Sequence, residues 1–339
     1  PESMESIARR LLHQAGRPFH DLAVTPIHGG GNNRAYRIDA GDTRYFLKHY
    51  FRAPTDPRDR FASETQFLRF AARQAPGWTP DLLGADAATG VALMEYVEGT
   101  RLADERPGEP EVTAALDFFC ALNANRRSPE ALDLPIASEA GFSVGDHLRL
   151  VERRVQRLGQ IQPDDETTRS ACRFSRDRLA PFFAGLHQRL SAHLDSSPEL
   201  AAEERVVSPS DFGFHNALRT TQQALRFVDF EYAGWDDPAK TISDFFLQPA
   251  VPVPHAHFPR VVRTVAEALQ QDALPHRVKS LYPLFGVKWC CILLNEFVPR
   301  DAARRSYARP GDRIEDRRRQ QLQRAEQLLA QLESGTFPP

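Results

Sequence analysis

Residues 208–234 read SPSDFGFHNALRTTQQALRFVDFEYAG, and this stretch decides how the chain is interpreted. Asn216 follows Asp211 by five residues, and Asp229 ends an apolar run typical of a strand. Phosphoryl transfer needs a carboxylate that orients or deprotonates the attacking hydroxyl, and oxygen ligands that fix Mg²⁺ against a triphosphate. The stretch therefore predicts Asp211 as the catalytic residue and Asn216 and Asp229 as metal ligands.

A glycine-rich stretch, HGGGNNRAYRI at residues 28–38, precedes this segment and lies between two expected strands. Its missing side chains would let backbone N–H groups cradle phosphate oxygens, although an ordinary hairpin turn also explains a glycine run. The predicted phosphate-binding residues are Gly29, Gly30, Gly31, Asn32 and Asn33. The two asparagines would donate side-chain hydrogen bonds to a phosphate, or would equally suit the positive φ of a turn.

Lys48 and Glu64 are the next candidates. The chain contains four lysines among its 43 basic residues, so the strong preference for arginine is not followed on the strand that carries Lys48. A compact ammonium there could contact the phosphates, and Glu64 on the following helix could pair with it and hold it toward them. A solvent-facing strand lysine and an exposed helix glutamate are the alternatives. Asp-x4-Asn is itself common, so the weight comes from the order of all these residues along the chain.

Hydrophobic periodicity divides the chain into two regimes. Short strands are expected between residues 23 and 50, near 82–85 and near 91–96, with helices at 5–14 and 58–73. From residue 110 the pattern is mostly helical, over 110–126, 143–158, 165–194, 256–271, 275–297 and 311–333. The polar stretch 97–110, rich in Gly and Pro, is typical of a crossover. The sequence predicts an α+β fold with one lobe over residues 1–100, a hinge near 94–100 and a second lobe over 101–339.

Composition restricts the possible partners. The 43 basic and 45 acidic residues give a net charge of −2, which provides no overall field for nucleic acid or an anionic membrane. Acids interrupt the arginine-rich stretch 300–324, which favours a solvated helix face. No apolar run approaches the ~18 residues of a membrane span, and no secretion segment opens the chain. We expect a soluble cytoplasmic protein whose four cysteines are buried, reduced thiols.

The ordered set resembles the kinase-like phosphotransferases of the aminoglycoside phosphotransferase and choline kinase superfamily. The matching segments are GGGNNRAYRI, YFLKHY, ALMEYVEG, SDFGFHN and FVDFEYAGWDDPAKTISDF. The resemblance implies a protein-kinase-like bilobal fold, with a small antiparallel β lobe carrying one helix and a larger, mainly helical lobe. It also implies that ATP binds at the hinge, with backbone groups of Glu95 to Val97 meeting the adenine and Met94 bordering the base. The implied reaction is Mg²⁺-dependent transfer of the γ-phosphoryl group to a hydroxyl of a small molecule, with Asp244 helping to hold the catalytic loop.

Pro209 departs from the family pattern, which usually has a histidine two residues before the catalytic aspartate. That histidine resembles a scaffold residue, so the departure concerns the geometry of the loop more than its chemistry. His215 lies inside the same loop, and packing is its favoured role because Asp211 already supplies the base.

The acceptor is the part of the function that the sequence leaves open. Acidic and aromatic side chains after the metal segment suit an amine or a sugar ring, and the candidates are Tyr232, Trp235, Asp236 and Trp289, with Asp237 beside them. Trp289 lies in the apolar helix LFGVKWCCILLNEF, where core packing is the alternative. Aminoglycosides, choline-like amino alcohols and sugars all remain possible.

Two other functions compete with a small-molecule kinase. A non-catalytic binding or scaffold protein would keep the fold, and Pro209 is its only support. A protein kinase is disfavoured, because no Ala-Pro-Glu-like segment follows Asp229 and the metal segment reads Asp-Phe-Glu rather than Asp-Phe-Gly.

Overall fold

A computed structural model of the protein describes residues 2–27, 33–52, 58–102, 106–192, 198–298 and 314–335. These residues pack into two compact units, and each is described on its own. The first unit comprises Pro1–Glu105, Thr113–Ser138 and Val207–Trp235. The second comprises Arg106–Val112, Glu139–Val206 and Asp236–Pro339. This division concerns packing, so the lobe boundary expected near residue 100 stays a prediction.

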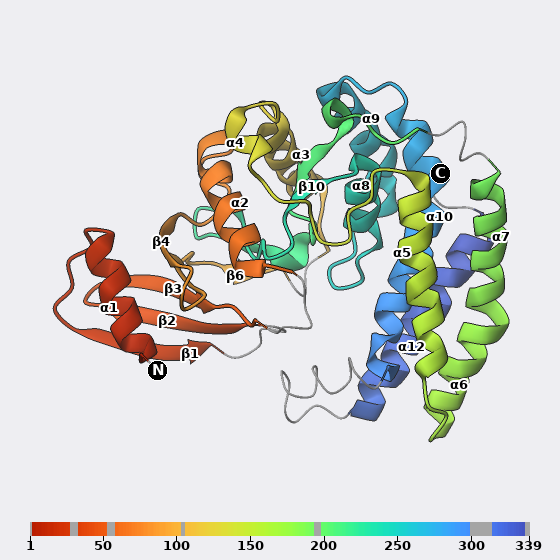
Figure 1. The fold of residues 1–339 in the computed structure, drawn as a ribbon, viewed down its shortest axis with the longest axis horizontal. Helices are drawn as coiled ribbons and strands as arrows, with labels where there is room; N and C mark the ends of the chain where they lie inside the picture. Colours follow the sequence, from red (N-terminus) through yellow and green to blue (C-terminus); the bar gives the residue numbers. More distant parts are fainter. Residues whose placement is uncertain are drawn as a thin grey trace. The chain divides into compact units, whose positions relative to one another are not determined.

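A five-stranded antiparallel sheet forms the beginning of the first unit (Figure 1). Its order is β1-β2-β3-β5-β4, with β1 at Leu22–Ile27, β2 at Arg34–Ala40, β3 at Thr43–His49, β4 at Leu82–Asp86 and β5 at Val91–Glu95. Helix α1 (Met4–Gln14) begins where the Ser3 side chain accepts a hydrogen bond from the Ser6 N–H. Its apolar face, with Ile7 and Leu11, packs into the core that lines one side of this sheet.

Helix α2 (Arg60–Gln74) packs against β4 and β5 and begins at Asp59, whose side chain caps the Ala62 N–H. The rest of the first unit contains α3 (Glu109–Asn123) from Thr113 onward, α4 (Pro129–Leu132) and short strands: β6 (Thr100–Arg101), β7 (Val206–Ser208) from Val207, β8 (Ala217–Arg219), β9 (Leu225–Phe227) and β10 (Gly234–Asp236) up to Trp235. Strands β6, β8 and β9 form a three-stranded sheet, and β7 pairs with β10. The short helix η5 (Phe214–Asn216) lies between β7 and β8.

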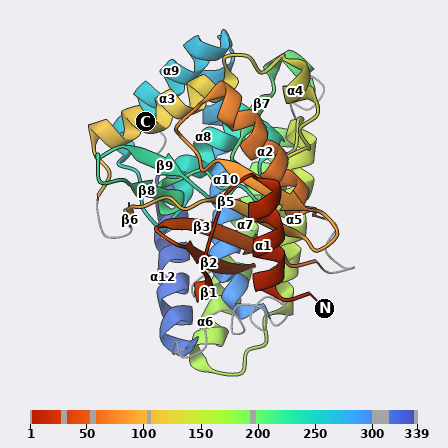
Figure 2. The same cartoon turned by 90° about the vertical axis from the view of Figure 1, so that its left-hand side faces the viewer.

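The second unit is mainly helical, and Figure 2 shows several of its helices from another side. Helix α10 (Leu274–Leu293) packs against α5 (Val144–Arg157), α8 (Pro238–Leu247) and α12 (Ile314–Glu333). Around them are α6 (Glu166–Phe174), the π-helical turn η2 (Ser175–Leu179), α7 (Ala180–Ser191) and α9 (Phe258–Leu269). Single turns among its described residues are η1 (Leu158–Gln160), η4 (Ala202–Glu204), η6 (His255–His257) and η7 (Leu294–Phe297).

The architecture confirms the predicted α+β class, with an antiparallel sheet and helix followed by a mainly helical region. Helix α8 was not predicted, although Ala239, Ile242 and Phe246 repeat at helical spacing; all ten of its residues are buried, so its polar side chains face protein as well. The strand expected to run to Asp229 ends at Phe227. The helix expected over 165–194 is interrupted by the π turn η2.

Two further expectations concern cysteines and membranes. Cys290 and Cys291 are buried, whereas Cys120 and Cys172 are partly exposed, and all four are free thiols. Within the ranges that the structure describes, no helix combines the length and the apolar character needed to cross a bilayer.

Candidate functional site

Lys48 lies at the centre of a cluster of acidic side chains in the first unit. Strand β3 places it between Ala35 of β2 and Ala92 of β5, and only 7% of the residue is exposed. Its Nζ lies 2.6 Å from Glu64 Oε2 and 2.6 Å from Asp229 Oδ1. The pairing of Lys48 with Glu64 that the sequence suggested is therefore present, and the metal-ligand candidate Asp229 joins it.

Glu64 is held by three donors. In addition to Lys48, the Tyr50 hydroxyl donates to Glu64 Oε2 at 2.7 Å, and the Phe230 N–H donates to Glu64 Oε1 at 3.0 Å. The last bond ties helix α2 to the backbone directly after Asp229. Glu64 therefore does more than orient the Lys48 ammonium, because it also fixes the segment that carries Asp229.

The opposite charges of Lys48 and Asp229 in this cluster stabilise each other. Burial opposes the Lys48 ammonium, but the carboxylates of Asp229, Glu64 and Glu231 outweigh burial and raise the pKa of Lys48. The Asp229 side chain is 48% exposed; its partial desolvation favours the neutral acid, yet the Lys48 ammonium lowers the pKa of that carboxyl. Both groups are thus charged at neutral pH, as binding of a phosphate and of a cation requires.

The few lysines of this chain occupy particular positions in the structure. Lys48, Lys240 and Lys288 are buried against carboxylates, whereas Lys279 is exposed. Three of the four lysines are therefore buried beside carboxylates, where a compact ammonium needs less space than the wider guanidinium of arginine.

The Asp211 loop lies between β7 and β8. His215 Nε2 lies 3.1 Å from Asp211 Oδ1, and Asn216 Nδ2 donates to Asp211 Oδ2 at 3.3 Å and to the Asp211 carbonyl at 3.0 Å. His215 therefore touches the catalytic candidate directly. Phe212 anchors the loop, since its buried ring lies 5.4 Å from the ring of Phe227.

A hairpin brings the Asp211 loop to Asp229. Strands β8 and β9 pair with Ala217 opposite Phe227, and the Val228 N–H donates to the Asn216 carbonyl at 2.9 Å. Asp229 itself has a φ of 69°, a left-handed conformation that is uncommon outside glycine and clusters at functional positions. The buried rings of Phe227 and Phe230 flank it, and Phe230 stacks on Phe67 at 4.5 Å.

The residues Asn216 and Asp229 suit Mg²⁺. An amide oxygen and a carboxylate are hard oxygen donors, and protein sites commonly give Mg²⁺ one or two carboxylates while substrate phosphates and water complete the octahedron. Asn216 uses its amide nitrogen on Asp211, which leaves its oxygen for another partner. In the part of the chain that the structure describes, no three His, Cys, Asp or Glu side chains form a group that could hold a metal ion.

Asn33 was expected to donate a hydrogen bond to a phosphate, but both polar atoms of its side chain bond to other residues of the protein. Its Nδ2 donates to Glu231 Oε2, and its Oδ1 accepts from the Phe51 N–H at 3.0 Å. Gly29, Gly30, Gly31 and Asn32 lie outside the described residues. Glu231 was not singled out in the sequence, although it is 4% exposed and lies 3.9 Å from Lys48 Nζ. Its position in the Asp-Phe-Glu segment was the available signal.

The expected hinge residues end strand β5. Met94 is buried and pairs with Phe46 and Leu82. Glu95 Oε2 accepts from Arg226 Nη2 at 2.6 Å, which links the start of the hinge to strand β9. Val97 follows and is partly exposed. Their role toward adenine stays a prediction.

The four acceptor candidates are divided between the two units. In the first unit, the guanidinium groups of Arg58 and Arg60 lie 5.6 and 5.8 Å from the ring centre of Tyr232. Trp235 donates its indole N–H to the Ala131 carbonyl at 2.9 Å. Each ring thus already has a polar or cationic neighbour within its own unit.

The other two acceptor candidates lie in the second unit. Asp236 is fully buried and accepts from Lys240 at 2.6 Å, while Trp289 donates to Asp244 Oδ1 at 2.7 Å. Lys288 Nζ also contacts both carboxylate oxygens of Asp244, at 2.5 and 2.6 Å. These contacts favour a structural role for this network, and binding of an acceptor by any of the four candidates stays a prediction.

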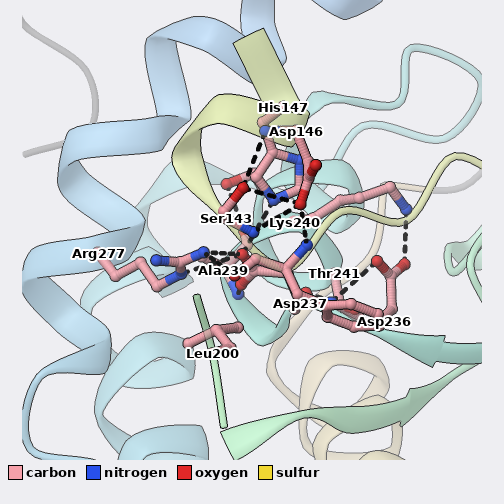
Figure 3. A network of polar contacts seen from close by, with 12 residues as sticks. Ser143, Asp146, His147, Leu200, Asp236, Asp237, Ala239, Lys240, Thr241 and Arg277 are labelled. Carbon is pink, nitrogen blue, oxygen red and sulfur yellow. Dashed lines mark hydrogen bonds and ion pairs between the residues drawn. The ribbon is translucent and has the colours of Figure 1, made fainter. Parts of the chain in front are cut away.

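Asp237 forms a second closed network in the second unit (Figure 3). His147 Nε2 lies 3.0 Å from Asp237 Oδ2, Arg277 Nη2 donates to the same oxygen at 2.6 Å, and Asp237 Oδ1 caps α8 through the Ala239 N–H at 2.7 Å. Burial alone would favour the neutral acid, but His147 and Arg277 lower the pKa of Asp237 to about 2. The Asp-Pro dipeptide at 237–238 was the local signal for this helix start.

Comparisons with known proteins identify a family and several solved structures that this chain resembles. A model of the phosphotransferase enzyme family matches residues 23–281. No significant match is found among curated protein sequences. The matched solved structures include a putative aminoglycoside phosphotransferase from Ralstonia eutropha, with 11% identity, 96% of this chain and 97% of that chain covered, and a TM-score of 0.61.

Two further structures show the same fold. Spectinomycin phosphotransferase APH(9)-Ia, solved with ADP and spectinomycin, has 11% identity, a TM-score of 0.59 and coverage of 96% of this chain and 98% of its own. Choline kinase LicA from Streptococcus pneumoniae has 16% identity, a TM-score of 0.57 and coverage of 97% and 99%. The fold is thus the kinase-like α+β fold that the sequence predicted.

Proposed function

Because the chain belongs to the phosphotransferase enzyme family, we propose that it moves the γ-phosphoryl group of ATP to a hydroxyl of a small molecule, with Mg²⁺ as cofactor. The observation that carries the proposal is the cluster in which Lys48 lies 2.6 Å from both Glu64 and Asp229. A buried ammonium fixed beside a carboxylate in left-handed backbone is an arrangement that a purely structural sheet does not need.

Each residue has one task in this mechanism. Lys48 contacts the phosphates as a point charge, and Glu64 keeps its ammonium in place. Asp211 accepts a hydrogen bond from the acceptor hydroxyl, orients its oxygen for in-line attack and takes the proton as the new O–P bond forms, while the bond between the γ-phosphorus and the bridging oxygen breaks and ADP leaves. Asn216 and Asp229 would hold Mg²⁺, which supplies neutralisation of the phosphate charge when bound.

The class of acceptor is proposed more broadly. The partly exposed aromatic residues Tyr232 and Trp235 lie close to Asp229 along the chain and suit a cationic or polyhydroxylated molecule, so an aminoglycoside, an amino alcohol or a sugar-like alcohol is the proposed acceptor. Related folds are described with spectinomycin and as choline or ethanolamine kinases, which fits this range. The phosphotransfer machinery does not encode the choice among them.

Thermal unfolding with and without ATP and Mg²⁺ tests the proposal. A ligand at ~100 times its Kd adds about 2.7 kcal/mol to the free energy of unfolding. We expect Mg²⁺-ATP to raise the melting temperature of the wild type, and Asp229→Asn to lose the Mg²⁺-dependent part. Asp164→Asn is the matched control, because Asp164 is exposed and lies outside the cluster.

The next step separates an enzyme from a binding protein. Pools of amino alcohols, aminoglycosides and sugars are screened for ADP release by the wild type. ADP release that depends on an acceptor supports the proposal. Nucleotide binding without ADP release from any pool supports the alternative, a kinase-like binding or scaffold protein that is catalytically impaired, and absence of any thermal shift at millimolar ATP refutes nucleotide binding.

A further inference from the structure

The backbone just before Asp211 is held in an unusual turn. Ser210 has a φ of 66°, a left-handed conformation that is energetically unfavourable for a residue with a Cβ. The Asp211 N–H turns back and donates to the Pro209 carbonyl at 2.9 Å. Because the turn sets the direction in which the Asp211 side chain leaves the backbone, something must hold Ser210 in this conformation.

The Ser208 hydroxyl is positioned to hold it. Ser208 is fully buried, and its Oγ accepts the Ser210 N–H at 2.9 Å, across Pro209. This side-chain-to-backbone bond spans two residues, which is the geometry by which serine stabilises turns. Proline has no N–H and a restricted φ, so Pro209 limits the conformations from which the turn can form.

The strand that carries Ser208 is itself fixed. Asn123 of α3 is 2% exposed; its Oδ1 accepts the Val207 N–H at 2.8 Å, and its Nδ2 donates to the Val207 carbonyl at 3.0 Å. One side chain thus pairs both backbone groups of the residue before Ser208. Asn123 Nδ2 also donates to the Phe119 carbonyl at 3.0 Å, which fixes the amide on its own helix.

We infer that Ser208 is a positioning residue for Asp211, acting through the Ser210 backbone, and this inference rests on the proposed function. Asn123 fixes Val207, the Ser208 hydroxyl fixes the Ser210 N–H, and the left-handed Ser210 aims the Asp211 carboxylate. The hydroxyl of Ser208 therefore stabilises the loop that contains Pro209, through its hydrogen bond with the Ser210 N–H.

Ser208→Ala tests the inference. Ser243→Ala is the matched control, because Ser243 is also fully buried and its hydroxyl bonds a backbone carbonyl, that of Ala239 at 2.7 Å, outside the Asp211 loop. For Ser208→Ala we expect kcat for ADP release to fall by about tenfold to a hundredfold, with the KM for ATP unchanged. Equal losses of kcat in the two variants, or a loss confined to the KM for ATP, would overturn the inference.

Hydrogen exchange of the Ser210 amide, measured without substrate, separates this inference from the proposed function. Faster exchange in Ser208→Ala but not in Ser243→Ala supports the brace even if no acceptor is phosphorylated, an outcome that would refute the proposed function alone. Unchanged exchange would overturn the brace. Ser208→Cys keeps the side-chain size with a weaker acceptor, so both its exchange rate and its kcat should lie between those of the wild type and the alanine variant.

Discussion

Lys48 and Asp229 are 181 residues apart in the chain, yet Lys48 Nζ lies 2.6 Å from Asp229 Oδ1. The lysine side chain is 9% exposed and that of the aspartate is 48% exposed. One end of the ion pair is therefore anchored in the protein, whereas the other is open to a ligand. This asymmetry suits a site in which Asp229 exchanges part of its contact with Lys48 for a metal–phosphate complex.

Lys48→Met should destabilise the protein. It removes the charge that compensates Glu64, which is 2% exposed, and breaking a buried ion pair from one side costs about 3–5 kcal/mol. Urea unfolding measures the loss. Lys279→Met is the control, because this exposed lysine should change the free energy of unfolding by no more than about 0.5 kcal/mol. Equal stability of the two variants would contradict the ion-pair cluster.

Asp211→Asn should abolish turnover but leave nucleotide binding. The amide keeps the shape of the side chain and cannot accept the proton of the hydroxyl, so kcat should fall by about 10²-fold or more. Steady-state ADP release measures this loss, while the thermal shift with Mg²⁺-ATP should stay at the wild-type value. Full activity in the variant would refute the assigned role.

Acid should destabilise the second unit through Asp237. Its pKa is about 2 in the folded protein against 3.8 ordinarily, so its stabilising effect is complete above pH 4 and is lost as the pH falls toward 2. The effect corresponds to roughly 2 kcal/mol. Urea unfolding at several pH values measures it. Asp237→Asn should be less stable than the wild type at pH 7, and the difference should narrow toward pH 2; a difference independent of pH would contradict the shifted carboxyl.

Gly99→Ala should be destabilising by about 1–3 kcal/mol. A Cβ at Gly99 would lie 2.8 Å from the Arg219 carbonyl oxygen, where β6 approaches β8. Gly159→Ala is the matched control, since a Cβ there meets no atom within 4 Å and the backbone suits alanine. Chemical denaturation compares them, and Gly159→Ala should be neutral or stabilising by up to about 1 kcal/mol. A tolerated Gly99→Ala would place β6 and β8 further apart.

Many helices and strands of the fold were predictable from local patterns in the sequence. Helix α1 was predicted because Ile7 and Leu11 repeat on one face while the other face meets solvent. Helix α8 was missed although residues 238–247 carry apolar residues at helical spacing; its polar residues Lys240 and Asp244 are buried in ion pairs instead of facing solvent. The strand before Asp229 was predicted to be too long. The apolar residues among 227–230 reflect the packing of phenylalanine rings as well as strand structure.

The sequence by itself determined which residues form the candidate site: a strand lysine, a helix glutamate, the Asp211–Asn216 pair and Asp229, in that order along the chain. Tertiary structure alone decided their partners. Asn33 faces Glu231 rather than being an isolated donor, and the Ser208 hydroxyl braces Ser210. The reason is physical. The alternation of buried and exposed positions along a helix or strand depends on residues close together in the sequence. The partner of a buried polar group depends instead on which distant segments packing brings within hydrogen-bond distance.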